Sequence, residues 1–142
     1  MKKIIAIFAI LFATLSVSGC APEATNELPK TGIIIENAYV TAGETEARVY
    51  AIITNRADAT VTLTGGTTDA AGVVKVMRGE GSSEQVLKDG VDIHVGQELP
   101  LDESKKHITL TKLTKPLIAG DTISFTFEFE GAEPQTFELT AK

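Results

Sequence analysis

The feature that most constrains the fold is strict alternation of apolar and polar side chains in the segment TISFTFEFE, residues 122–130. The apolar positions are Ile123, Phe125, Phe127 and Phe129. A period of two residues is typical of a β-strand with one buried face and one exposed face. Burying four such side chains contributes about 6–10 kcal/mol, at about 1.5–3 kcal/mol each. We therefore expect this strand at the centre of the core.

Similar short alternating runs recur along the chain from Gly32 onward, whereas no window shows helical periodicity. Strands are predicted at residues 33–41, 47–55, 59–65, 73–78 and 107–111, separated by segments with turn residues. Regularly spaced short strands favour two packed antiparallel sheets. The predicted fold is all-β, a Greek-key β-sandwich of cupredoxin- or immunoglobulin-like architecture with about eight or nine strands.

The first 31 residues have the composition of a targeting and linker segment. Lys2 and Lys3 precede an apolar run that is too short to span a bilayer comfortably, and Ser18-Gly19-Cys20 follows it. Small residues before a cysteine resemble the lipobox of bacterial lipoproteins. We therefore predict a signal peptide at residues 1–19, a lipidated Cys20 with a flexible tether at residues 20–31, and one domain at residues 32–142.

Charge and cysteine content narrow the class of function. Removing residues 1–19 takes away two of the 13 basic residues and none of the 19 acidic ones, so the net charge changes from −6 to −8. An acidic surface argues against nucleic-acid binding, and membrane attachment is expected through the lipid anchor instead. Cys20 is the only cysteine, which rules out an intrachain disulfide.

Residues 107–130 carry a pattern close to H-[LI]-M-L-x-x-L-x-x-P-L-x-x-G-D-x-[IV]-x-[LF]-x-[LF]-x-F. The matching positions are His107, Leu110, Leu113, Pro116, Leu117, Gly120, Asp121, Ile123, Phe125, Phe127 and Phe129. The pattern resembles that of the bacterial periplasmic copper chaperone family known as PCu(A)C. Residues 33–40 and 47–55 also resemble that family, so the likeness covers about residues 33–139.

The resemblance implies a copper site of histidines and methionines, of which this chain retains only part. The family pattern has methionine at the position of Thr109, histidine at that of Met77 and methionine at that of Gly79. Another methionine is expected within residues 84–88, and the only methionines here are Met1 and Met77. His107 and Met77 therefore remain as the candidate metal ligands.

The alternation within the strands allows these two ligands to meet. If Val74 and Val76 face the core, Met77 lies on the opposite face of its strand, as His107 does on its own. A thioether with an imidazole suits Cu(I). Two alternatives stay open, namely copper held by His94 together with His107, or no physiological metal. Zinc and iron sites are disfavoured because carboxylate–histidine clusters with ligand spacing are missing from the sequence.

The sequence therefore predicts a membrane-anchored, extracytoplasmic copper chaperone-like protein that binds or delivers Cu(I) for cuproenzyme assembly. Its expected partners are a cuproenzyme or another copper chaperone, on the periplasmic side of a membrane or at the cell surface. We expect no enzyme, because no nucleophile elbow, phosphate-binding glycine loop or H-E-x-x-H motif occurs. The alternative is a ligand-depleted relative that acts as an interaction or structural module without metal.

Overall fold

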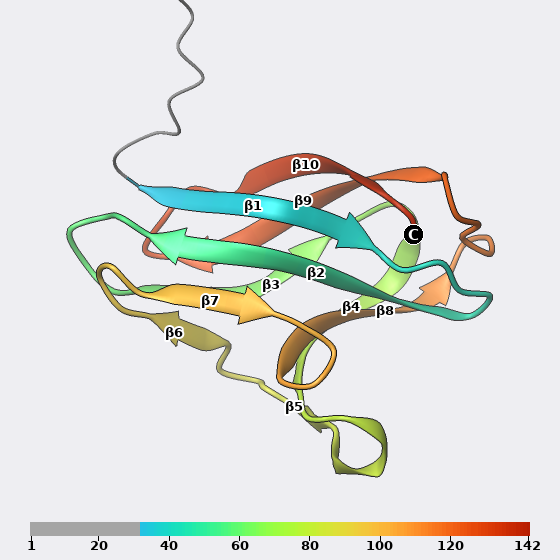
Figure 1. Ribbon diagram of the computed structural model, residues 1–142, viewed down its shortest axis with the longest axis horizontal. Helices are drawn as coiled ribbons and strands as arrows, with labels where there is room; N and C mark the ends of the chain where they lie inside the picture. Colours follow the sequence, from blue (N-terminus) through green and yellow to red (C-terminus); the bar gives the residue numbers. More distant parts are fainter. Residues whose placement is uncertain (1–31) are drawn as a thin grey trace, which may run out of the picture.

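A computed structural model describes residues 32–142, which form ten strands and one short 3-10 helix (Figure 1). The predicted signal peptide, lipidated Cys20 and tether lie outside these described residues. The elements are β1 Ile33–Val40, β2 Glu46–Asn55, β3 Val61–Thr67, β4 Ala71–Arg78, η1 Gly81–Ser83, β5 Gln85–Val86, β6 Val91–Ile93, β7 Glu98–Leu101, β8 Lys106–Leu113, β9 Thr122–Glu130 and β10 Gln135–Thr140.

The strands form two sheets. One has six strands in the order β1-β2-β7-β8-β4-β5, and the other has four in the order β10-β9-β3-β6. Nearly all pairings are antiparallel, and the exception is a short parallel contact between β7 and β8. The chain crosses between the sheets several times, for example from β2 to β3 and from β8 to β9. This confirms the predicted β-sandwich.

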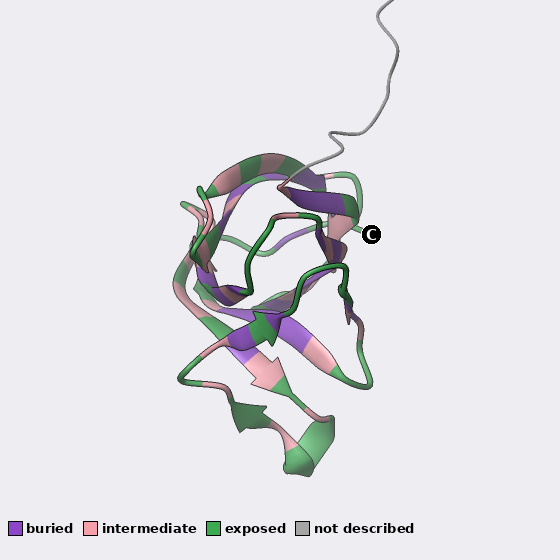
Figure 2. Ribbon diagram, turned by 90° about the vertical axis from the view of Figure 1, so that its left-hand side faces the viewer, coloured by how far each residue is buried: buried purple, intermediate pink, exposed green. Residues whose placement is uncertain are grey.

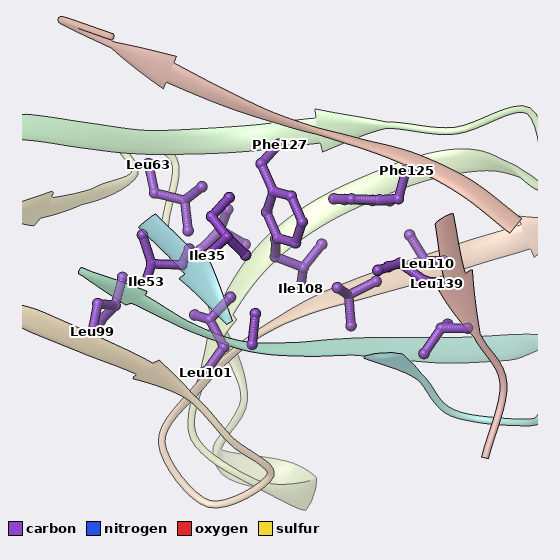
Figure 3. Close-up of a cluster of buried hydrophobic side chains, with 14 of the residues drawn as sticks. Ile35, Ile53, Leu63, Leu99, Leu101, Ile108, Leu110, Phe125, Phe127 and Leu139 are labelled. Atoms are coloured by element: carbon purple, nitrogen blue, oxygen red, sulfur yellow. The ribbon is translucent and has the colours of Figure 1, made fainter. Parts of the chain in front are cut away.

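The core lies between the two sheets and uses the side chains that the alternation predicted (Figure 3). On β9, Ile123, Phe125 and Phe127 are buried, whereas Phe129 at the strand end is only partly buried. Phe125 and Phe127 pack edge to face with ring centroids 4.8 Å apart, a favourable geometry for aromatic pairs. Ile108 of β8 faces them from the other sheet and is fully buried.

The predicted strands are confirmed with small shifts at their ends, and the range of β9 agrees with the prediction. The expected number of eight or nine strands was slightly low. Ten strands form because short pairings at β5, β6 and β7 add to the longer ones. A two- to four-residue strand is too short to show a recognisable alternation, so its sequence reads as a loop.

The strand β8 and the segment after β4 position the candidate site. β8 pairs with β2 on one side and with β4 on the other. After β4 the chain turns through η1 into β5, and this segment projects below the sandwich in the views of Figures 1 and 2, at the edge of the six-stranded sheet. Within residues 32–142, no helix has the length and apolar character needed to cross a membrane.

Candidate metal site

Met77 and His107 lie directly opposite each other on neighbouring antiparallel strands. The register of β4 and β8 pairs Val76 with Ile108 and Met77 with His107. Val76 and Ile108 face the core, so Met77 and His107 both lie on the outer face of the six-stranded sheet. Directly opposite residues have their Cβ atoms about 4.5–5.5 Å apart. The fold therefore brings the two predicted ligands together.

His107 is fully buried although it lies on the outer face. Its Nδ1 and Nε2 atoms have no hydrogen-bond partner among the residues that the structure describes. A buried polar group without a partner costs about 1–3 kcal/mol. An imidazole that is held in place and leaves its nitrogens unused is suited to a ligand that arrives later, such as a metal ion.

The carboxylate of Glu84 covers the imidazole of His107. Glu84 Oε1 lies 3.4 Å from His107 Nε2, and it accepts a 2.7 Å hydrogen bond from Arg48 Nη2. Arg48 Nε is also 3.7 Å from Glu46 Oε1. Arg48 comes from β2 and Glu84 from the segment between η1 and β5, so two separate segments meet over His107 of β8.

This environment favours the neutral imidazole. Burial lowers the pKa of His107, and the nearby charge of Arg48 lowers it further, while Glu84 and Glu46 act in the opposite direction. The balance is a pKa below the ordinary value of about 6.5. A neutral imidazole is the form that can bind metals, because it keeps a nitrogen lone pair free.

Thr109 occupies the position where the resembling family has methionine. It is buried, and its Oγ1 atom has no hydrogen-bond partner within residues 32–142. Arg48 and Lys75 are its direct neighbours on the two flanking strands. A hydroxyl between two cationic residues is a poor ligand for Cu(I), so Thr109 adds nothing to a soft metal site.

His94 lies elsewhere in the sandwich and does not join this group. It follows β6, a strand of the four-stranded sheet, and its Nδ1 atom is 3.2 Å from Thr60 Oγ1. It is exposed, whereas His107 is buried in the six-stranded sheet. The structure therefore gives no support to copper held by His94 together with His107. No group of three or more His, Cys, Asp or Glu residues able to hold a metal occurs within residues 32–142.

The sequence of residues 33–141 matches the family model described as LpqE-like lipoprotein. The chain belongs to the LpqE-like family. A comparison of the whole sequence with curated proteins gives no significant match.

Solved structures of PCuAC domains share the fold of this LpqE-like chain. The apo PCuAC domain from PmoF1 and the copper-bound PCuAC domain from PmoF2 each superpose with a TM-score of 0.65 at 22% identity, over 78% of this chain and 92% of theirs. The Cu(I) form of DR1885 from Deinococcus radiodurans gives 0.64 at 23% identity, over 84% of this chain and 83% of that one. The predicted resemblance to PCu(A)C is thus confirmed for the fold.

Sequence reasoning missed Arg48 and Glu84. The family pattern directed attention to residues 84–88 only as the place of a missing methionine, and Arg48 read as an ordinary polar position on a strand. Their ion pair joins residues 36 positions apart. One signal was available. Alternation along this strand places Arg48 with Tyr50 on the outer face and Val49 on the core face, so Arg48 lies on the same side of the sheet as His107.

Proposed function

We propose that this LpqE-like protein is a membrane-anchored, extracytoplasmic copper chaperone-like protein that binds Cu(I) through His107 and Met77. The observation that carries the proposal is the direct pairing of these two residues across β4 and β8, with both nitrogens of the buried His107 free of hydrogen bonds within the described chain. Soft thioether sulfur and imidazole nitrogen are ligands that suit Cu(I).

Two further observations support copper as the cargo. Two of the superposed structures are copper-bound by their names, one of PmoF2 and one of DR1885, and both share the fold of this chain. The low pKa of His107 keeps the imidazole neutral, so a proton does not compete with copper near neutral pH.

A site with few ligands suits transfer better than storage. Two protein ligands leave coordination positions on the copper ion open. Ligands of an acceptor protein can occupy these positions before His107 and Met77 dissociate from the metal. We propose a cuproenzyme or another copper chaperone as that acceptor. Lipidation of Cys20 would hold the domain at the membrane surface, on the periplasmic side or at the cell surface, where such an acceptor is exposed.

A second candidate function is a metal-free interaction module, and a specific observation favours it. Arg48 already neutralises Glu84 directly over His107, so the cluster balances its own charges without metal. Thr109 and Gly79 stand where the resembling family has methionines. In this reading the contacts among Arg48, Glu84 and His107 stabilise the sheet, and the exposed part of the domain contacts partners during cuproenzyme assembly.

A competitive titration with Cu(I) separates the two functions. We would use residues 21–142, which contain every described strand and the whole described core but lack the thiol of Cys20. His107→Ala and Met77→Leu are the test variants. His94→Ala is the matched control, because that exposed imidazole lies in the other sheet.

The copper chaperone proposal predicts one-to-one Cu(I) binding that both test variants lose and the control keeps. Cu(I) binding by the unmodified domain that is no stronger than in His107→Ala and Met77→Leu would contradict it. That outcome would favour the interaction module.

A further inference from the structure

We infer that Glu84 is a third metal ligand, which lets the site hold Cu(II) as well as Cu(I), and that Arg48 holds this carboxylate in place until the metal arrives. The inference rests on the proposed function, because it uses the same His107. The inference adds a carboxylate ligand where the resembling family has a methionine. A carboxylate allows the site to bind Cu(II) in addition to Cu(I).

The spacing of Glu84 and His107 is that of two ligands on one metal. Metal–nitrogen and metal–oxygen bonds of about 2.0–2.1 Å place the two ligand atoms about 3.3–3.4 Å apart at a tetrahedral angle, and about 2.9 Å apart at the right angle that tetragonal Cu(II) prefers. Glu84 Oε1 and His107 Nε2 are 3.4 Å apart. Both atoms can therefore coordinate one ion after only small movements.

The contact between His107 Nε2 and Glu84 Oε1 is longer than a good hydrogen bond, so an entering metal would have little to break. His107 Nε2 has no hydrogen-bond partner among residues 32–142, even though a carboxylate oxygen lies beside it. With a neutral imidazole, the nitrogen facing Glu84 can carry its lone pair, so the two atoms present two acceptors to one point in space. In that tautomer, a metal ion between the two atoms would satisfy both of them.

Arg48 supplies the positive charge beside Glu84 in the metal-free protein. Its guanidinium donates to Glu84 Oε1 at 2.7 Å, and the two side chains are only 22% and 19% exposed. A largely buried carboxylate needs a nearby positive charge. A divalent ion between His107 and Glu84 would provide that charge itself, and Arg48 would then keep Glu46, 3.7 Å away, as its partner.

The identity of the third ligand decides which form of copper is bound. Among divalent first-row metals, Cu²⁺ forms the most stable complexes with nitrogen and oxygen ligands, whereas thioether sulfur selects Cu(I). Met77 lies opposite His107 on one side, and Glu84 covers it on another. Cu(I) would use His107 with Met77, and Cu(II) would use His107 with Glu84.

Parallel titrations of residues 21–142 with Cu(I) and with Cu(II), each against a competing chelator, test this assignment. Glu84→Gln keeps the size and a hydrogen-bond acceptor for Arg48 but loses the charge. We expect its Cu(II) affinity to fall by about tenfold or more, and its Cu(I) affinity to change by less than about threefold. Glu138→Gln is the control, because it lies exposed on β10 in the other sheet.

Arg48→Gln provides a test in the opposite direction. It frees the carboxylate from a competing ion pair, so we expect Cu(II) to bind about two- to fivefold more tightly. A purely structural Arg48–Glu84 pair predicts no gain of Cu(II) affinity in this variant. Thermal unfolding of each variant shows whether its domain is folded.

The outcomes distinguish this inference from the proposed function. Loss of Cu(I) binding in His107→Ala together with unchanged Cu(II) binding in Glu84→Gln would overturn the role of Glu84 and leave the chaperone proposal intact. A domain that binds no Cu(I), yet binds Cu(II) in a Glu84-dependent way, would overturn the proposed Cu(I) function and support the ligand assignment. Equal Cu(II) affinity of the unmodified domain, Glu84→Gln and Arg48→Gln would contradict the inference.

Discussion

Single residues would decide how strongly the proposed site holds soft copper, and Thr109 is the clearest case. Its side chain lies on the same face as His107, two residues further along β8. Thr109→Met would place a second thioether there, so we expect Cu(I) affinity to rise by about tenfold or more, equivalent to about 1.4 kcal/mol. The competitive Cu(I) titration measures this gain in affinity relative to the unmodified domain.

The matched control for this prediction is Thr111→Met. Thr111 follows on the same face of the same strand but is paired with Glu46 and Val73, away from His107. An equal gain in both variants would mean that a methionine anywhere on this face recruits Cu(I), and the assignment of a site at His107 would fail.

The pKa of His107 makes the stability of the metal-free domain depend on pH. Because the folded-state pKa is lower than the ordinary value of about 6.5, the unfolded chain binds a proton first as the pH falls. We therefore expect the free energy of unfolding to be highest above pH about 6.5 and to decrease below it, by at most about 1.4 kcal/mol per pH unit for one group.

Denaturant unfolding of the metal-free domain between pH 5 and 8 measures this dependence. The charged groups that face His107 are Arg48 and Glu46 of β2 and Glu84 before β5. The variant His107→Gln removes the imidazole but keeps these groups, so its stability should change less between pH 7 and pH 5.5. The same slope in both proteins would contradict a lowered pKa of His107.

At the scale of elements, the connection from β4 through η1 to β5 positions Glu84 beside His107. Gly79 allows the chain to turn at the start of this connection. Gly79 has φ +94°, and a Cβ atom there would lie 2.7 Å from the backbone oxygen of Ser83. We expect Gly79→Ala to destabilise the domain by about 1–3 kcal/mol. Because Glu84 shifts with the turn, Cu(II) affinity should fall as well.

Gly120→Ala is the control for the turn. Gly120 has a similar φ of +98°, but a Cβ atom there meets nothing within 4 Å. Its loop between β8 and β9 does not carry Glu84. Thermal unfolding should show a smaller loss in this variant, and its copper affinities should stay unchanged. Equal losses of stability and of Cu(II) affinity in both variants would argue against the turn at Gly79 as the device that positions Glu84.

The comparison of elements also shows how much the sequence could predict. Alternation in a single strand fixes which face each residue takes, so the shared outer face of His107 and Met77 was predictable from residues 73–78 and 107–111. Their direct pairing depends on the register of β4 against β8, and that is set by packing across the whole sandwich. The ion pair of Arg48 and Glu84 joins distant segments and leaves no periodic trace in the sequence.

At the scale of the whole molecule, the core between the sheets holds the outer-face site in register. Phe127 is fully buried at the centre of this core, whereas Phe129 on the same strand is only partly buried. We expect Phe127→Ala to lower the free energy of unfolding by about 3–5 kcal/mol, and Phe129→Ala to lower it by clearly less. Denaturant unfolding measures both, and equal losses would contradict the deeper burial of Phe127 as the source of the difference.

We propose that the attachment of the whole molecule to a membrane depends on Cys20 rather than on surface charge. The chain without residues 1–19 has a net charge of −8, from 11 basic and 19 acidic residues, so anionic lipid repels it. Several acyl chains on Cys20 would anchor it stably, whereas one chain binds only marginally. We expect the protein in the membrane fraction of cells, resistant to a high-salt wash, and Cys20→Ser outside that fraction.

High salt distinguishes the two kinds of attachment because it screens charge but strengthens the burial of acyl chains. Release of the unmodified protein by salt would contradict a lipid anchor and indicate a charged partner instead. Retention of Cys20→Ser in the membrane would point to an uncleaved apolar segment at residues 4–17 as the anchor. Either result would leave the proposed copper site unchanged, because His107, Met77 and Glu84 lie in a sandwich whose described strands begin at Ile33.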